Sequence, residues 1–237
     1  MTERILVTGA SRGIGAAIAR NLAHRGAVVI LHAFQNEERA RALAAELPGG
    51  PHPVLVADLA DPNAVSSLFE GAGALTGLVN NAGIYEPHPP LSVDLETWRA
   101  HWDRTLAVNL RAAADLTFLA AHAGVSRIVQ ISSRGAFRGE PEAPAYGASK
   151  GGMNSMSGSF ARALAPRGVA VFVVAPGWVE TEMASPHLDA EIVAGLPLGR
   201  AATADEVAAM VGFCLYEAPL SLTGAILDVN GASYLRS

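Results

Sequence analysis

Short apolar stretches alternate with amphipathic stretches along almost the whole chain. The apolar stretches are rich in Val, Ile, Leu and Ala, which is typical of strands buried on both faces of a parallel sheet. They cover residues 4–7, 27–33, 53–57, 75–79, 125–131, 168–175 and 223–229. We therefore expect a sheet of about seven strands.

Apolar residues at helical spacing fill the intervals between these strands. Asp61 and Pro62 suit the N-cap and first turn of one helix, and residues 203–206 form a capping box. Helices are predicted from residue 14 to the C-cap Gly26, then over 37–47, 62–71, 95–123, 146–166 and 203–216. The helix over 95–123 is expected to be bent or broken. Residues 183–198 have no firm pattern, and we interpret them as a mobile lid.

The alternation of strands and helices indicates the fold class. No linker and no internal repeat interrupts it, so residues 1–237 are predicted to form a single domain. Strand–helix–strand units of this kind form a doubly wound parallel sheet with right-handed crossovers and helices on both faces. We therefore predict an α/β Rossmann fold.

Composition narrows the classes of function. Half of the 237 residues are hydrophobic, 16% are charged and the mean hydropathy is +0.27, which is enough for one substantial core. A net charge of −5 and a pI near 5.8 favour neither nucleic acid nor an anionic membrane as a partner.

Cysteine and histidine usage argues against a disulfide framework and a metal site. Cys214 is the only cysteine, and the seven histidines never stand at ligand spacing. No targeting pattern leads into the apolar residues 5–7, and no segment is long and apolar enough to span a bilayer. We therefore expect a soluble cytoplasmic protein.

A glycine turn follows the first predicted strand and opens a helix. Gly9, Gly13 and Gly15 stand at Gly-x-x-x-Gly-x-Gly spacing, between the strand and the stripe that starts at Ile14. Glycines permit close approach of the backbone to a pyrophosphate, and the helix N-terminus offers free N–H groups. The turn could be purely structural, but its position between strand and helix favours a nucleotide-phosphate site.

The end of the second strand bears on the choice of cofactor. Enzymes that prefer NAD usually place an acid there for the ribose 2′-hydroxyl, whereas this strand ends without one before Glu37. Arg12, in the glycine turn, is the available cation. This combination favours a 2′-phosphate and hence NADP over NAD. The alternative is that Arg12 is simply solvated.

Further polar residues follow other strands or interrupt a helix. Asp58-Leu59 and Asn80–Gly83 lie at the carboxyl ends of strands, where open α/β sheets bind ligands. The asparagines could be turn formers, or their amides could fix neighbouring loops over a cofactor. Asn109 lies within the long apolar helix and must find hydrogen-bond partners there.

A tyrosine and a lysine stand four residues apart near the start of the helix over 146–166. Tyr146 and Lys150 therefore share a helix face, and the ammonium is expected to lower the pKa of the phenol. Such a pair suits general acid/base chemistry, but spacing alone also describes many solvated helix faces. Ser132 and Ser133 follow the fifth strand, and Ser133 precedes Tyr146 by thirteen residues.

Taken together, these motifs resemble the classical short-chain dehydrogenase/reductases over nearly the whole chain. By that resemblance, Tyr146 exchanges a proton with a substrate carbonyl as hydride moves to or from a nicotinamide. Lys150 would hold the nicotinamide ribose and lower the Tyr146 pKa, and Ser133 would orient the substrate oxygen. Asn109 would hold a water that links Lys150 to solvent, and Ser132 would be a strand-end hydrogen bonder.

The resemblance also implies a set of cofactor contacts in addition to Tyr146 and Lys150. They are Gly9, Ser11, Arg12, Gly13, Ile14 and Gly15 at the phosphates, Asp58 and Leu59 at adenine, Asn81, Ala82 and Gly83 along the middle, and Pro176, Gly177, Val179 and Thr181 towards the nicotinamide. Phe34 departs from NADP-dependent relatives, which often have a small hydroxyl residue at that position.

Within the family, three phrases resemble the 3-oxoacyl-acyl-carrier-protein reductases: 8–15, 175–183 and 229–234. That branch implies docking of an acidic carrier beside basic residues. Arg167 is present, but residues 120–124 lack the expected basic cluster. The alternatives are an NADP-dependent carbonyl reductase acting on a free ketone and, outside catalysis, an NADP-binding sensor or scaffold.

Two properties are implied by the resemblance alone. A homotetramer would assemble through the helical stretches 106–119 and 153–164, which are rich in small residues and leucine. Substrate choice would lie in residues 85–90, 134–144 and 183–198, whose pattern the sequence leaves uninterpreted.

Overall fold

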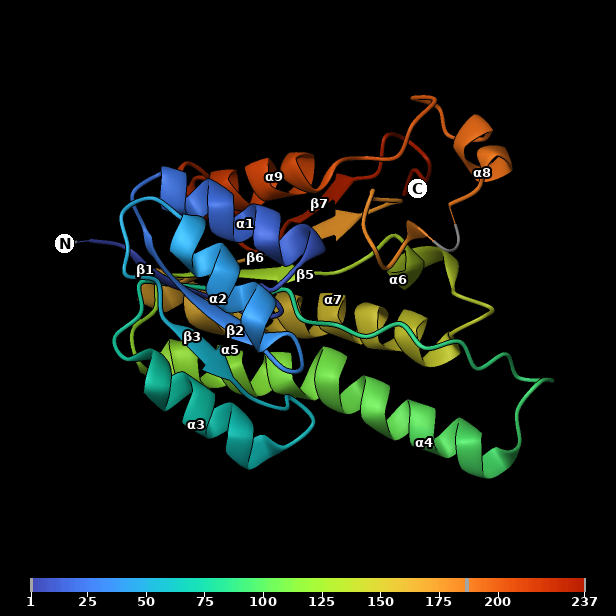
Figure 1. Ribbon diagram of the computed structural model, residues 1–237, viewed down its shortest axis with the longest axis horizontal. Coiled ribbons are helices and arrows are strands. Elements are labelled where there is room, and N and C mark those ends of the chain that lie inside the picture. The colour runs from blue at the N-terminus through green and yellow to red at the C-terminus, as the bar shows by residue number, and fades with distance from the viewer. Residues whose placement is uncertain (1, 186–187, 237) are drawn as a thin grey trace.

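One parallel sheet organises the computed structural model, which describes residues 2–185 and 188–236. Its seven strands run in the order β3-β2-β1-β4-β5-β6-β7, which confirms the predicted Rossmann-like class (Figure 1). The strands are β1 (Arg4–Val7), β2 (Val28–Ala33), β3 (Val54–Val56), β4 (Gly77–Asn80), β5 (Arg127–Ile131), β6 (Ala170–Pro176) and β7 (Ile226–Val229).

Strand order reverses at β1, which pairs with β2 on one side and with β4 on the other. Val7 is in register with Leu31 of β2 and with Val79 of β4. The loops that leave the carboxyl ends of β1 and β4 therefore diverge to opposite faces of the sheet. This switch point is where open α/β sheets bind ligands.

Helices cover both faces of the sheet. They are α1 (Gly13–His24), α2 (Glu37–Glu46), α3 (Pro62–Ala72), α4 (Leu95–Leu106), the π-helical η1 (Ala107–Arg111), α5 (Ala112–His122), α6 (Gly135–Arg138), α7 (Pro144–Leu164), α8 (Ala190–Ala194) and α9 (Ala204–Tyr216), with 3₁₀ turns at Ala165–Arg167 and Leu220–Leu222. Helices α1, α2 and α9 lie on one side, and α3, α4, α5 and α7 on the other (Figure 1).

Alternate residues of the inner strands supply the two cores. In β1, Ile5 and Val7 join the core beneath α1 and α9, whereas Leu6 joins the core beneath α3, α5 and α7. Because successive strand residues point to opposite faces, a strand buried on both sides needs apolar residues at every position. This requirement explains the continuous apolar runs of the sequence.

The long helical stretch is distorted at one point and otherwise continuous. Between α4 and α5 the chain winds as the π-helical η1, which contains the buried Asn109. Short π-helical segments inside α-helices are frequent at functional sites. The expected bend or break is thus a local widening of the helix around Asn109.

Other sequence boundaries shift by a few residues. β6 begins at Ala170 rather than at 168, because the 3₁₀ turn before it ends at Gly168 with a left-handed φ of +72°. Part of the supposedly patternless stretch 183–198 is helix α8, whose N-cap Asp189 accepts a hydrogen bond from the Ile192 amide. Residues 186 and 187 of that stretch lie outside the described residues, and its role as a lid stays a prediction.

The remaining fold features agree with the capping predictions. Thr203 and Glu206 form the capping box of α9, and the Asp61 side chain caps α3 with Pro62 in the first turn. In the described part of the chain, no helix has both the length and the hydropathy to cross a bilayer.

Candidate active site

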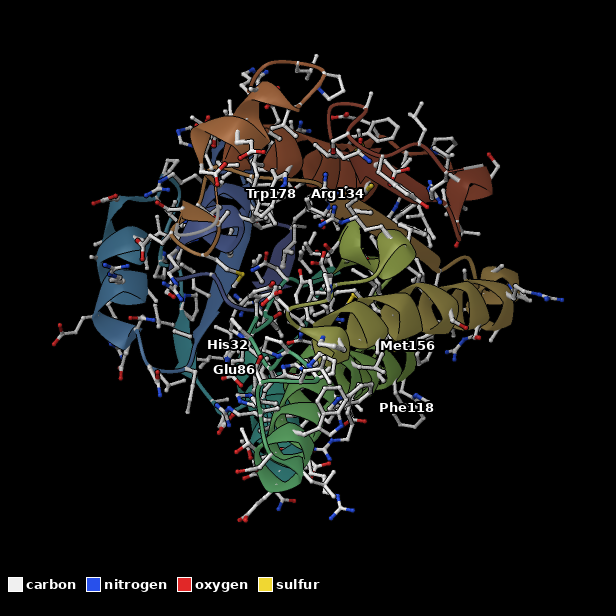
Figure 2. All side chains as sticks on the ribbon, turned by 90° about the vertical axis from the view of Figure 1, so that its right-hand side faces the viewer. His32, Glu86, Phe118, Arg134, Met156 and Trp178 are labelled. Atoms are coloured by element: carbon white, nitrogen blue, oxygen red, sulfur yellow. The ribbon has the colours of Figure 1, made fainter. Side chains whose placement is uncertain are left out.

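A cavity of about 390 Å³ opens at the carboxyl edge of the sheet. Figure 2 views the molecule from this side and labels Trp178, Arg134 and His32, which line the cavity. Every site residue predicted from the sequence lines the cavity except Asn109, which lies behind it. Residues from six different stretches of the chain thus meet at one place.

The glycine turn has no room for side chains at its closest points. A Cβ on Gly15 would lie 2.1 Å from the Gly9 carbonyl oxygen, and one on Gly9 would lie 2.9 Å from the Ala82 Cα. Gly9 also has a left-handed φ of +65°. The exposed backbone of this turn fits a bound dinucleotide phosphate. A side chain at Gly9 or Gly15 would fill the space that the turn leaves free.

Asn81 ties the turn to the end of β4. Its side-chain amide donates to the carbonyl oxygens of Thr8 (2.8 Å) and Gly9 (3.1 Å). The Thr8 hydroxyl in return accepts hydrogen bonds from the backbone amides of Asn81 and Ala82, both at 3.0 Å. The asparagine therefore positions two loops against each other, as one of the two readings of this pair predicted.

His32 is a second support for the turn, and sequence reasoning missed it. Its ring is buried, Nδ1 accepts from the Gly9 amide at 3.1 Å and Nε2 lies 3.1 Å from the Ala57 carbonyl oxygen. An amide can only donate and a carbonyl only accept, so the ring is neutral with its proton on Nε2. Burial lowers the pKa of His32, which maintains this form.

The far end of the cavity carries an ion-pair cluster that we call the Arg12 corner, formed by Arg12, Arg39 and Glu182. Arg12 Nη1 lies 3.1 Å from Glu182 Oε2, and Arg39 Nη1 lies 2.9 Å from Glu182 Oε1. All three side chains are about half exposed. Arg12 is therefore neither simply solvated nor a free cation. Arg39 was missed because it has no motif of its own and meets Glu182 only in the fold.

Asp58 and its neighbours form the wall between the glycine turn and α4. Asp58 Oδ1 accepts from the Ala60 amide at 2.9 Å, and Oδ2 lies 3.8 Å from Arg104 Nη1. The Arg104 guanidinium also lies over the Phe34 ring, 5.9 Å from its centre. This arrangement gives the wall a flat, partly aromatic surface next to Leu59.

At the opposite end, Ser133, Tyr146, Lys150 and Asn109 form what we call the Tyr146 corner. Lys150 is 3% exposed, and its Nζ donates to the Ile131 carbonyl at 2.7 Å. Burial lowers the Lys150 pKa to about 8. The ammonium lies 5.7 Å from the centre of the Tyr146 ring.

The expected direction of the Tyr146 pKa is wrong for this structure. Burial raises it to about 12, and the hydrogen bond with Ser133 opposes that rise without cancelling it. Helical spacing predicts a nearby positive charge but cannot show how fully the phenol is desolvated, and desolvation dominates here. The phenol consequently keeps its proton at neutral pH.

The two serines after β5 have different partners. Ser133 hydrogen-bonds with Tyr146 and accepts from the Gly135 amide at 3.0 Å. The Ser132 hydroxyl instead donates to the Lys150 carbonyl at 3.4 Å. The geometry thus separates Ser133, which faces the tyrosine, from Ser132, which joins a strand end to a helix.

Asn109 finds its partners in the loop after β4 and in α7. Its Oδ1 accepts from the Ile84 amide at 2.8 Å, and its Nδ2 donates to the Ile84 carbonyl at 3.0 Å and to the Ser149 hydroxyl at 3.2 Å. The side chain therefore clamps the loop of Gly83 and Ile84 beside Lys150. A water-holding role for Asn109 stays a prediction.

Residues after β6 close the cavity. A Cβ on Gly177 would lie 2.8 Å from the Asn230 Cβ, so the chain turns tightly against the loop after β7. Val179 then forms a parallel bridge with Ala202, and Thr181 packs near Gly13. Tyr85, Arg134, Arg138 and Glu140 also line the cavity. They belong to the stretches 85–90 and 134–144, to which the resemblance assigned substrate choice without singling out a residue.

The fold and the site together define a class of protein. A glycine turn at the switch point of a parallel sheet, with serine, tyrosine and a buried lysine in the same cavity, describes a dinucleotide-dependent α/β oxidoreductase. A family model described as enoyl-(acyl carrier protein) reductase matches residues 9–232. The chain belongs to the short-chain dehydrogenase/reductase family.

Individual relatives differ in the reactions that their names describe. The 3-oxoacyl-[acyl-carrier-protein] reductase FabG of Escherichia coli (strain K12) is 37% identical over 237 residues, covering 97% of this chain and 96% of the relative. The cis-4-hydroxycyclohexanecarboxylate dehydrogenase of Sinomonas cyclohexanicum is 36% identical over 245 residues, with the same coverage. The crystal structure of the angucycline C-6 ketoreductase LanV with bound NADP has a TM-score of 0.88 and 32% identity, covering 98% of this chain and 95% of that one.

Proposed function

We propose that this short-chain dehydrogenase/reductase is an NADP(H)-dependent enzyme that reduces a ketone to a secondary alcohol, with residues 1–237 acting as one domain. The observation that carries the proposal is the half-buried Tyr146 phenol, hydrogen-bonded to Ser133 in the cavity that begins at the glycine turn. The bound nicotinamide would supply the hydride. The protein's own residues would handle the proton and the geometry.

Tyr146 is the proposed general acid. A phenol whose pKa is about 12 holds its proton at neutral pH, so the donor form is the dominant one. As negative charge develops on the substrate oxygen, that oxygen takes the Tyr146 proton and leaves a phenolate. Ser133 would hydrogen-bond the same oxygen and fix its position between the two hydroxyls.

Lys150 is proposed to stabilise the phenolate and to hold the nicotinamide ribose. Its ammonium lies 5.7 Å from the Tyr146 ring in a buried setting, where charges interact strongly. Asn109 would act on Lys150 indirectly, because it clamps the loop that packs against the ammonium.

NADP is the proposed cofactor, in preference to NAD. The support is the pair of arginines in the Arg12 corner and the absence of an acid at the end of β2 before Glu37. Two guanidinium groups suit a 2′-phosphate, which would take the position between them that Glu182 now holds. A relative of similar fold, LanV, was crystallised with NADP.

For the substrate we propose a 3-oxoacyl thioester or a similar carbonyl compound. The FabG relative supports an acyl-carrier thioester, and Arg167 is exposed beside α7 as a docking charge would be. The lack of basic residues over 120–124 favours a free ketone instead. The names of two other relatives describe a ketoreductase and a dehydrogenase of a hydroxy acid, which supports the same alternative.

Assembly as a homotetramer is part of the proposal. Phe118 of α5 is 54% exposed, and Figure 2 shows it on the same flank as Met156 of α7. Met156 is partly exposed, and apolar groups that reach the surface on two neighbouring helices are typical of subunit interfaces. Light scattering that reports a single-chain mass at micromolar concentration would contradict this part.

NADPH oxidation with a panel of free ketones, free β-ketoacyl thioesters and carrier-linked thioesters tests the function. Turnover of at least one ketone is expected, and the ranking of the three groups decides between carrier-linked and free substrates. Tight NADP binding without turnover of any ketone would contradict the proposed enzyme activity and would indicate a sensor or scaffold.

A further inference from the structure

A buried arginine lines the substrate end of the cavity. Arg134 directly follows Ser133 and is 8% exposed. Its Nη1 donates to the Ser233 hydroxyl at 2.9 Å, and its guanidinium lies over the Trp178 ring, 5.7 Å from the centre. Figure 2 shows Arg134 and Trp178 side by side at the margin of the cavity.

The charge on Arg134 has no ion-pair partner of its own. Within residues 2–185 and 188–236, the acid that acts on it electrostatically is Glu140, and no carboxylate forms a salt bridge with it. Burial and the neighbouring charge of Arg138 lower the Arg134 pKa. A desolvated guanidinium normally has an anionic partner, so the Arg134 guanidinium is suited to bind an anion in the cavity.

Arg138 adds a second positive charge one helical turn later. Residues i and i+4 lie on one face of a helix, and both arginines line the cavity. Arg138 Nε is 3.9 Å from Glu140 Oε1, and its side chain is 43% exposed. The contact to Glu140 is long, so the guanidinium of Arg138 remains suitable for a two-pronged contact with an anion.

Glu140 is the one acid among these groups. Its side chain is 16% exposed and runs over Gly135, where an added Cβ would lie 2.4 Å from Oε1. It is also close enough to raise the pKa values of Tyr85 and Tyr146. Among the residues that line this end of the cavity, two arginines therefore stand against one glutamate. The exposed Glu142, which also raises the pKa of Tyr85, lies outside the lining.

We propose that the substrate is a keto acid whose carboxylate binds between Arg134 and Arg138. This inference rests on the proposed ketone reduction and deepens its free-ketone alternative, because the acyl group of a thioester has no free carboxylate. Arg134 follows Ser133, the residue proposed to hold the reacting oxygen, so the anionic group belongs to the substrate itself. The phosphate of a long carrier arm, by contrast, would be far from the carbonyl.

The test compares keto acids with their methyl esters, because each pair shares a ketone and differs in charge. The probes are 3-oxobutanoate, 4-oxopentanoate and 5-oxohexanoate at pH 7, where the carboxylates are ionised. For at least one pair, kcat/KM for the acid should exceed that for the ester by about 10- to 100-fold, mainly through KM. A ratio of one or less in all three pairs would overturn the inference.

Four variants assign the effect to the arginines. Arg138→Gln should bring the acid-to-ester ratio close to one, and Glu140→Gln should raise it. Arg134→Lys should retain part of the preference for the acid over the ester that Arg134→Gln loses. If neither Arg134 variant folds, the ratio measured for Arg138→Gln alone decides whether the inference stands. The control Arg20→Gln removes an arginine of α1 that is half exposed and pairs only distantly with Glu46, so it should leave the ratio at the wild-type value.

A binding measurement separates this inference from the proposed function. If no ketone is reduced, calorimetry with 4-oxopentanoate and its methyl ester on the protein–NADP complex still reports the anion site. Binding of the acid alone that is lost in Arg138→Gln would support the site while the reductase proposal fails. Equal or absent binding of both compounds would overturn the keto-acid site.

Discussion

The Tyr146 corner and the Arg12 corner belong to one cavity but are stabilised in opposite ways. Lys150 is 3% exposed and Asn109 is completely buried, and both bind backbone groups of other elements. At the Arg12 corner, three charged side chains meet one another while about half exposed. One corner is held by desolvated hydrogen bonds and the other by solvated ion pairs.

This difference predicts how each corner responds to change. A buried polar group that loses its partner has no water to replace it, so substitutions there should have large effects. Exposed ion pairs contribute little and reorganise easily, so a ligand anion can displace a carboxylate from them at small cost. Chemistry is therefore expected at the Tyr146 corner, and cofactor discrimination at the Arg12 corner.

The largest effect is expected for Tyr146→Phe, which removes the proton donor and leaves the ring in place. We expect kcat for ketone reduction to fall by about 10²- to 10⁴-fold, with NADPH binding retained. Tyr85→Phe is the matched control, because its ring lies 5.2 Å from Tyr146, and it should lower kcat by less than about tenfold. Equal losses in the two variants would refute the assignment of the proton to Tyr146.

The second effect is a pH dependence of stability that comes from Lys150. Its pKa is about 8 in the folded chain and 10.5 without burial, so between these values the unfolded chain binds more protons. Stability then rises with pH, by at most about 1.4 kcal/mol per unit. Between pH 8 and 10 the free energy of unfolding of the wild type should therefore rise by on the order of 2 kcal/mol relative to that of Lys150→Met.

Urea unfolding of both proteins at pH 7, 8, 9 and 10 measures this difference. Tyr146 works in the opposite direction, because its raised pKa makes the folded chain less stable above pH 10. Both proteins contain Tyr146, so that contribution largely cancels in the difference. Parallel pH profiles would show that Lys150 is less desolvated than the structure indicates.

The contrast between the corners also explains what the sequence could predict. The strands and the Tyr146 corner follow from apolar runs and from residues at fixed spacing on single elements. The Arg12 corner joins residues 143 positions apart, Arg39 and Glu182, which no local pattern connects. Likewise, spacing indicated that Lys150 lies near Tyr146, but the direction of the Tyr146 pKa depends on burial, which only the packed fold determines.

A third, intermediate effect is expected when the arginines of the Arg12 corner are removed. Arg12→Ala and Arg39→Ala should each weaken NADPH binding by about 5- to 20-fold and leave NADH binding nearly the same, since each removes a contact to the 2′-phosphate alone. Fluorescence titration with both cofactors measures the ratio. Arg41→Ala, which removes an exposed arginine paired within α2, is the control. An equal loss for NADH and NADPH would show that these arginines do not discriminate the cofactors.

The smallest effect, with the opposite sign, is expected for Glu182→Gln. Hydrogen bonds from Arg39 and Arg12 lower the Glu182 pKa, so the carboxylate is ionised at neutral pH and competes with the 2′-phosphate for both guanidinium groups. Because the cluster is solvated, removing that charge should tighten NADPH binding by only about two- to fivefold.

Salt makes the Glu182 prediction sharper. Screening weakens the exposed ion pairs and the phosphate contacts together. The gain in NADPH affinity of Glu182→Gln should therefore shrink as ionic strength rises towards 1 M. Glu46→Gln removes an exposed acid that lies 4.0 Å from Arg20 and serves as the control for net charge. Weaker NADPH binding in Glu182→Gln would mean that Glu182 organises the two arginines for the phosphate instead of competing with it, and cofactor choice would then depend on all three side chains as one unit.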